Sequence, residues 1–346
     1  MMKSDIQSPQ ESRIVSSMAQ EDIKVEVVCN NALTYPADVL VLKHAQGLFG
    51  LDAVIVGTLR MAGGRYFQLP DPGDILFEKS VEGIAAQRIL FVGVPILYEF
   101  GYGEIRKFAQ KALKSIGETV PYAKHVMLTV HGPGYGLDEI EAFKAEIAGL
   151  VDAVRSGEYP HALQTLTIIE IDRGRVERLQ NTLRNVLKDG VIRAEVPNPS
   201  EYVITRELLR TAGFSSEAKP KVFVAMPFKD EMDDTYHYGI QSAVNAAGYL
   251  CERADLSSFT GDVLEWVKSR IRSSSLVIAD LTEANPNVYL EVGYAWGVGI
   301  PTVLVVRKTD EVKFDVRGQR RLVYGKIKEL EDLLTTELKS LPKITG

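Results

Sequence analysis

Short runs of β-branched and aliphatic residues alternate with amphipathic segments along almost the whole chain. This alternation limits the possible folds more than any other feature. In the first half the strand-like runs are VEVVC, DVLVL, DILFE, RILFVGV, HVMLTV and LTIIEI. Segments such as EIRKFAQKALKSIGE and DEIEAFKAEIAGLVDAV lie between them, with apolar residues three and four positions apart. Strands that alternate with helices favour parallel sheets covered by helices, so the pattern predicts an α/β fold.

The alternation stops at about residue 190 and starts again at VFVAM, near residue 222. The intervening segment contains Pro, Ser and Gly without a sustained period, which is typical of a linker. The chain has 346 residues, more than one domain usually holds. We therefore expect a disordered tail over 1–22, a three-layer first domain over 23–189, a linker over 190–219 and a second domain over 220–346. The second domain should contain about five strands in a parallel sheet of the flavodoxin type.

The amino-acid composition limits which binding partners and which cellular compartment are expected. A net charge of −6 without a Lys/Arg stripe argues against nucleic acid as a partner. The basic cluster RGQRR (317–321) is read as a solvated loop or a single phosphate contact. The two cysteines, Cys29 and Cys251, suit a reducing compartment better than a disulfide framework. The N-terminus lacks the apolar segment of a secretory signal, and the longest apolar run is too short and broken for a membrane span. We expect a cytoplasmic protein without a membrane partner.

The stretch NPNVYLEVGYAWGVG places an acidic residue, Glu291, inside an apolar, helix-like segment. A capping box would need the Glu at the third helical position. With Asn287 as the cap that position is Leu290, and with Asn285 as the cap it is Val288, so neither register fits. A carboxylate that only complements the helix dipole remains an alternative. It accounts less well for apolar neighbours, beside which a charged group loses hydration.

A ligand crevice is expected at the carboxyl ends of the second domain's strands, where parallel sheets bind their ligands. The run SLVIAD places Asp280 at such an end. The helix that follows holds Glu291 and, three positions later on the same side, Tyr294. These residues are therefore candidates to face a bound nucleotide.

The second domain resembles the nucleoside 2-deoxyribosyltransferase-like proteins and their relatives, the prokaryotic TIR-like domains. The resemblance covers about residues 220–330 and is carried by VFVAMPF, by GDVLEWVKSRIRSSSLVIADLTEANPNVYLEVGYAWGVGIPTVLV and by FDVRGQRRLVYG. It implies that Glu291 attacks or stabilises an anomeric carbon. It also implies that Asp262 holds sugar hydroxyls or assists the leaving base, although GD is an ordinary helix start as well. It further implies that Pro227, Phe228 and Asn287 contact the nucleotide; Phe228 could stack on a base or simply belong to the core.

N-glycosidic bond cleavage suits this set of residues. The reaction develops oxocarbenium character, which an adjacent carboxylate stabilises, and a proton donor helps the base to leave. No His/Cys cluster has metal-ligand spacing, so we expect no metal and no tightly bound cofactor. The five histidines are scattered, and His237 is expected at a surface or an interface.

Two glycine-containing stretches mark the first domain. The segment 36–64 contains a strand, Gly50 and an apolar helix, and HVMLTV runs into HGPGYG before another helix. A glycine-rich turn at a helix start can expose backbone N–H groups to phosphate, but it can also be a plain turn.

Together these stretches resemble the macro domain, including the N-terminal domain of leucine aminopeptidases, over about residues 24–187. The resemblance implies that Gly50, Gly134, Tyr135 and Gly136 contact an ADP-ribose-like or other nucleotide ligand. It leaves Asp52 poorly placed to hold adenine. Where catalytic macro domains carry an Asn-rich segment this chain has KHAQ (43–46), which disfavours ADP-ribosyl hydrolysis and favours binding.

The two resemblances together imply an effector that responds to a nucleotide signal and cleaves an N-glycosidic bond, with NAD as the expected substrate. They also imply a role in bacterial anti-phage defence and a homo-oligomer whose sites are completed by a neighbouring subunit. Two alternatives stay open: a non-catalytic nucleotide-binding module that signals or assembles, and a nucleoside deoxyribosyltransferase of housekeeping metabolism.

Overall fold

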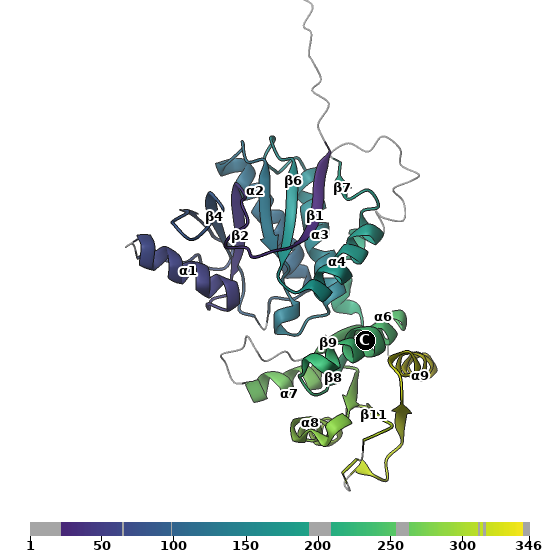
Figure 1. Ribbon diagram of the computed structural model, residues 1–346. Helices are drawn as coiled ribbons and strands as arrows, with labels where there is room; N and C mark the ends of the chain where they lie inside the picture. Colours follow the sequence, from purple (N-terminus) through teal and green to yellow (C-terminus); the bar gives the residue numbers. More distant parts are fainter. Residues whose placement is uncertain are drawn as a thin grey trace, which may run out of the picture.

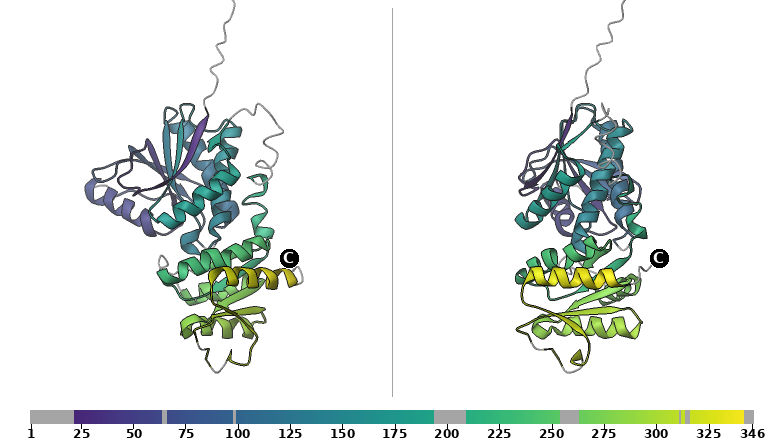
Figure 2. Two further views of the ribbon diagram at one scale, coloured as in Figure 1. Left: turned by 45° about the vertical axis from the view of Figure 1, so that its right-hand side comes forward. Right: turned by 90° about the vertical axis from the view of Figure 1, so that its right-hand side faces the viewer.

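The protein consists of two α/β domains that follow one another along the chain, as the alternation predicts. The computed structural model describes residues 22–63, 66–97, 99–193, 209–253, 263–310, 312–313 and 316–341. Two separate sheets form, one of seven strands and one of five. Figures 1 and 2 show them in different parts of the molecule, with no strand of one domain entering the sheet of the other.

The first domain is built on a mixed sheet with the order β3-β4-β2-β5-β6-β1-β7. Its inner strands are parallel, whereas the edge strands β3 and β7 run antiparallel to their neighbours. The strands are β1 (Ile23–Cys29), β2 (Val39–His44), β3 (Ile75–Lys79), β4 (Arg88–Gly93), β5 (His125–Thr129), β6 (Thr165–Glu170) and β7 (Val191–Ile192). The runs of β-branched and aliphatic residues in β2, β4, β5 and β6 are buried on both faces, as expected of a covered parallel sheet, whereas β1 alternates buried with more exposed positions.

Helices cover both faces of this sheet and give the predicted three layers. One face packs against α2 (Tyr102–Thr119), α3 (Glu139–Arg155) and α4 (Arg173–Val186). The other face packs against α1 (Gly50–Gly63). The short helix η1 (Pro133–Tyr135) lies in the glycine-rich turn between β5 and α3.

The second domain has an all-parallel sheet with the order β12-β11-β10-β8-β9, which is the flavodoxin order. Its strands are β8 (Lys221–Ala225), β9 (Leu250–Arg253), β10 (Leu276–Asp280), β11 (Thr302–Arg307) and β12 (Arg321–Tyr324). On one face lie α7 (Val263–Ser273) and α8 (Pro286–Gly297). The other face is covered by the π-helix η4 (Thr235–Gln241), α6 (Ser242–Ala246) and α9 (Ile327–Ser340). The short helices are η2 (Ser216–Ala218), η3 (Asp230–Met232) and η6 (Thr282–Ala284).

The segment predicted as a linker is partly structured. Strand β7 pairs with β1 and so extends the first sheet beyond residue 189. Leu209 and Ala212 are buried in the core of the first domain. The guanidinium of Arg106 donates to the carbonyls of Leu209, Arg210 and Ala212. Sequence periodicity misses this attachment because it depends on one buried arginine from α2; residues 194–208 lie outside the described part of the chain.

Close packing of α2 on α3 depends on a glycine. A Cβ at Gly149 would lie 2.1 Å from the backbone oxygen of Arg106. We expect Gly149→Ala to destabilise the protein by about 1 to 3 kcal/mol, since the two helices must move apart. Gly57→Ala on α1 is the matched control, because nothing lies within 4 Å of a Cβ there. This control should stabilise the protein by about 0.4 to 1 kcal/mol. Urea unfolding measures both, and equal effects of the two substitutions would contradict this account.

The described helices carry no candidate membrane span, since none combines the length and the apolar character that crossing a bilayer requires.

Candidate functional site

A cavity of about 460 Å³ lies on the α7–α8 side of the second domain. It adjoins Met226, directly after β8, and β8 is paired with β10 at the point where the strand order reverses. Flavodoxin-type sheets place their ligands at such a switch point. The lining is largely apolar: Met226, Phe228, Leu264, Val267, Lys268, Ile271, Asn285, Asn287, Val288, Leu290, Glu291 and Tyr294.

The register of α8 directs Glu291 to this cavity. Asn285 is the N-cap, its side chain accepts from the backbone N–H of Asn287 at 2.9 Å, and Pro286 occupies the first helical position. Glu291 therefore lies six residues after the cap. From that position its carboxylate cannot close a capping box, which confirms the register argument made from the sequence.

The Glu291 carboxyl has no compensating partner among the described residues. It is half-buried, and no described group forms a hydrogen bond or an ion pair with it. Burial raises its pKa from 4.5 to about 7. Loss of hydration penalises the charged form, so the proton is held near neutral pH. A carboxyl poised near pH 7 in a cleft has the properties of a functional group.

The raised pKa predicts that Glu291 destabilises the fold at neutral pH. A carboxyl whose pKa is higher in the folded state contributes stability below its unfolded pKa and loses it as the pH rises through the folded value. Here the loss should occur between about pH 4.5 and 7 and reach up to about 3 kcal/mol. Glu291→Gln cannot ionise, so its stability relative to the parent should increase over this window. Urea unfolding at pH 4 and pH 8 tests this; a difference independent of pH would contradict it.

Three further residues predicted to contact substrate also line the cavity. Phe228 is 45% exposed and lies beside Arg253, so it does not belong to the core. Asn287 is exposed at the start of α8. Tyr294 is half-buried, and its hydroxyl accepts from Arg272 at 2.6 Å. Two aromatic rings therefore flank the cavity that holds Glu291.

Two other predicted contacts are corrected by the structure. Asp280 is fully buried away from the cavity, where it accepts from the Tyr324 hydroxyl at 2.9 Å and from the backbone N–H of Thr282 at 3.0 Å. It joins the end of β10 to Tyr324 of the edge strand β12. Pro227 is buried, and its neighbour Met226 lines the cavity instead. Asp262 lies outside the described residues.

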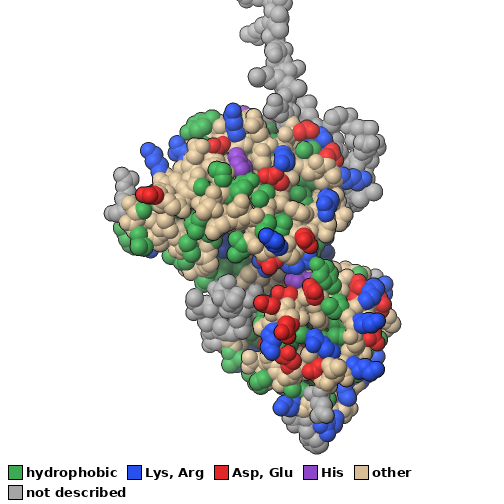
Figure 3. Space-filling view, viewed as in Figure 1, with side chains coloured by type: hydrophobic (Ala, Val, Ile, Leu, Met, Phe, Trp, Pro, Cys, Tyr) green, Lys and Arg blue, Asp and Glu red, His purple; other side chains and the backbone are tan. Residues whose placement is uncertain are grey.

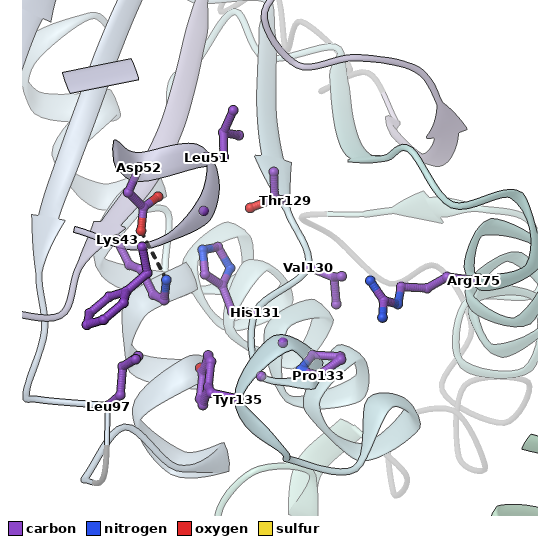
Figure 4. A pocket seen from close by; sticks show the side chains of 14 residues that line it. Lys43, Leu51, Asp52, Leu97, Thr129, Val130, His131, Pro133, Tyr135 and Arg175 are labelled. Atoms are coloured by element: carbon purple, nitrogen blue, oxygen red, sulfur yellow. Dashed lines mark hydrogen bonds and ion pairs between the residues drawn. The ribbon is translucent and has the colours of Figure 1, made fainter. Parts of the chain in front are cut away.

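A second cavity, of about 200 Å³, lies in the first domain beyond the ends of β2 and β5 (Figure 4). The predicted ligand residues Gly50, Gly134 and Tyr135 line it. The rest of the lining comes from five separate stretches of the chain: Lys43, Phe49, Leu51, Asp52, Leu97, Thr129, Val130, His131, Gly132, Pro133 and Arg175. Gly136 is not among the lining residues and faces Trp266, so its contact with a ligand stays a prediction.

Buried polar groups distinguish this cavity from an apolar packing defect. Lys43 Nζ lies 3.1 Å from Asp52 Oδ2, and both side chains are nearly buried. His131 Nδ1 lies 3.1 Å from Glu146 Oε1, which places the ring proton on Nδ1 when the carboxylate is ionised. The Tyr135 hydroxyl is buried without a hydrogen-bond partner among the described residues. An unsatisfied buried hydroxyl costs free energy and is suited to a polar ligand.

Sequence reasoning missed much of this set. Asp52, expected to be poorly placed for adenine, lines the cavity and pairs with Lys43 of the KHAQ segment. His131 is one of five histidines scattered along the sequence, although it immediately precedes the glycine turn. Arg175 comes from α4, forty residues further along the chain, and Figure 4 shows its side chain extending toward the turn. These residues are far apart in the sequence and come together only when the strands pair in the sheet. No local sequence pattern therefore links them.

The histidines, cysteines and acidic residues of the described ranges form no group of three or more that could hold a metal ion. Cys29 and Cys251 are both free thiols.

Comparison with known proteins gives fold-level neighbours only. No protein-family model matches the chain, and no curated protein matches it. Among solved structures, a Clostridium botulinum CMP N-glycosidase shows 18% identity and a TM-score of 0.30, covering 34% of this chain and 98% of its own. An Oceanobacillus iheyensis macrodomain solved with MES shows 12% identity and a TM-score of 0.37, covering 49% of this chain and 95% of its own.

Proposed function

We propose that the second domain cleaves an N-glycosidic bond and that Glu291 is the carboxylate facing the anomeric carbon. The observation that carries this proposal is the placement of Glu291: a half-buried carboxyl in an apolar cavity at the sheet's switch point, without a partner among the residues that the structure describes. The resemblance of the ADLT..NPNVYLEVGYA segment to the deoxyribosyltransferase-like and TIR-like proteins supports the same assignment.

The environment of Glu291 suits this chemistry. When the bond to the base breaks, positive charge develops on the sugar, and an adjacent anion stabilises it as nucleophile or ion partner. In an apolar cavity that attraction is stronger than in water. Burial makes ionisation of Glu291 unfavourable in the empty site. In the transition state, the attraction between the carboxylate and the positive sugar offsets this free-energy cost. Phe228 and Tyr294 provide aromatic faces against which a base could stack.

We further propose that the first domain binds an ADP-ribose-like or other nucleotide ligand. Its cavity offers a cation, a phenol and a glycine turn to such a ligand. The substrate we propose is NAD. A homo-oligomer and a role in anti-phage defence remain predictions from the resemblance.

The test is a base-release assay with the purified full chain. NAD and deoxynucleosides are supplied separately, with and without ADP-ribose, and the free base is followed by chromatography. Release of nicotinamide from NAD supports the proposal. Exchange of deoxyribose between two bases would favour the transferase alternative. No release from any of these substrates would contradict the catalytic role and favour a binding module.

A further inference from the structure

The glycine turn over residues 132–138 contacts both domains. On one side Gly132, Gly134 and Tyr135 line the cavity of the first domain. On the other side Gly136, with φ +94°, touches the second domain. A Cβ at Gly136 would lie 2.8 Å from Trp266 Cη2 and 2.9 Å from the backbone oxygen of Arg253. The turn therefore packs directly against the indole ring.

Trp266 belongs to α7, the helix that forms one wall of the Glu291 cavity. Its side chain is buried, and it packs in the core that joins α7 and α8 to the sheet. Leu264, Val267, Lys268 and Ile271 of the same helix line the cavity. One helix thus separates the glycine turn from the proposed catalytic site.

A buried hydrogen-bond network holds this junction together. The Tyr102 hydroxyl accepts from the backbone N–H of Asp138 at 2.9 Å and donates to Glu252 at 3.0 Å. Asp138 Oδ2 accepts from the backbone N–H of Cys251 at 2.9 Å. Glu252 also pairs with Arg270 of α7 at 3.1 Å. The end of the turn and the cavity helix are therefore fixed to the same group of residues.

A third cavity, of about 320 Å³, lies between the two domains and adjoins both sites. It shares Arg175 with the first-domain cavity and Phe228 with the Glu291 cavity. Figure 3 shows the waist between the domains, with acidic and basic side chains near it. Space next to a contact lets the groups on either side change position without new clashes, whereas a fully packed interior would resist.

We propose that occupancy of the first-domain cavity is coupled to the shape of the Glu291 cavity through the contact between Gly136 and Trp266. This inference rests on the proposed function, since it names how the nucleotide regulates the catalytic site. A ligand that engages Tyr135 shifts the turn, the turn moves the indole, and the indole moves α7. By linkage, a ligand in the Glu291 cavity changes affinity in the first cavity by the same factor.

Tryptophan fluorescence of the full chain tests the coupling without requiring catalysis. The chain has two tryptophans, so Trp296→Phe leaves Trp266 as the sole reporter. ADP-ribose is titrated while calorimetry records binding independently. We expect Trp266 emission to change along the calorimetric binding curve, and hydrogen exchange in residues 263–273 to change by at least about fivefold. The matched control is Trp266→Phe, in which Trp296, exposed on α8, should report no change.

The outcomes separate failure of the coupling from failure of the proposed function. Binding without a change in Trp266 emission or in exchange would overturn the coupling and leave the base-release proposal standing. If ADP-ribose does not bind, the ligand assignment fails, and the coupling is tested by Gly134→Phe in the Trp296→Phe background. Gly134 lines the cavity, and a Cβ there meets nothing within 4 Å, so the backbone accepts a side chain at this position. Unchanged Trp266 emission and exchange in that variant would overturn the coupling.

Discussion

Replacing Glu291 by Gln is expected to lower base release by about 10² to 10³-fold, the usual contribution of a single group that stabilises charge developing in the transition state. The amide keeps the shape of the side chain but provides no negative charge for the developing oxocarbenium ion. The effect should appear in kcat as well as in kcat/KM, because the lost interaction forms mainly in the transition state. Initial rates and single-turnover rates of nicotinamide release from NAD measure it.

The pH profile of the parent gives an independent signature of Glu291. Since burial raises the pKa of this carboxyl to about 7, a role that needs the anion predicts a rate that rises as the pH increases through about 7. Glu329→Gln, exposed on α9, is the control and should retain the parent rate and profile. Release at the parent rate by Glu291→Gln would remove Glu291 from the mechanism. The expected gain in stability of this variant at pH 8 shows that any loss of activity is not caused by unfolding.

Replacing Arg106 by Ala is expected to destabilise the protein by about 2 to 5 kcal/mol, because two buried backbone carbonyls lose their donor at about 1 to 3 kcal/mol each, whereas Asp152, with a side chain 30% exposed, stays partly hydrated. Arg106 is 6% exposed and forms a two-pronged pair with Asp152, at 2.6 and 3.0 Å. The substitution also removes donors from the backbone carbonyls of Leu209 and Ala212. Hydrogen exchange should therefore increase selectively over residues 209–219. Urea unfolding and exchange together measure the effect.

Two controls separate geometry from charge at this position. Arg106→Lys keeps the charge but cannot reproduce the planar fork, so it should recover only part of the lost stability. Lys107→Ala removes the neighbouring exposed cation, whose pair with Glu104 is worth about 0 to 1 kcal/mol. If Arg106→Ala cost no more than Lys107→Ala, the connection between the domains would not depend on the guanidinium.

Much of the fold could be predicted from the sequence because it follows from local patterns. Runs of β-branched residues predict most strands of both sheets. The stretch from SLVIAD to GYA predicts a strand, a loop and a helix in that order. Asn285 and Pro286 set the start of α8, so the depth of Glu291 in that helix follows from the chain itself. The four residues of β12, RLVY, are too few to show a period, so the position of this strand depends on its pairing with β11.

Each candidate site could be predicted only in part, since a cavity joins residues that are distant in sequence. The sequence by itself determined three features: the two α/β domains, the helix register that excludes Glu291 from a capping box, and a glycine turn able to line a ligand cavity. Only the tertiary structure decided that Asp280 is a buried structural carboxyl, that Lys43, Asp52 and Arg175 share one cavity, and that Gly136 packs on Trp266. The physical reason is that periodicity and capping act over a few neighbouring residues, whereas burial and ion pairing depend on which strands and helices meet.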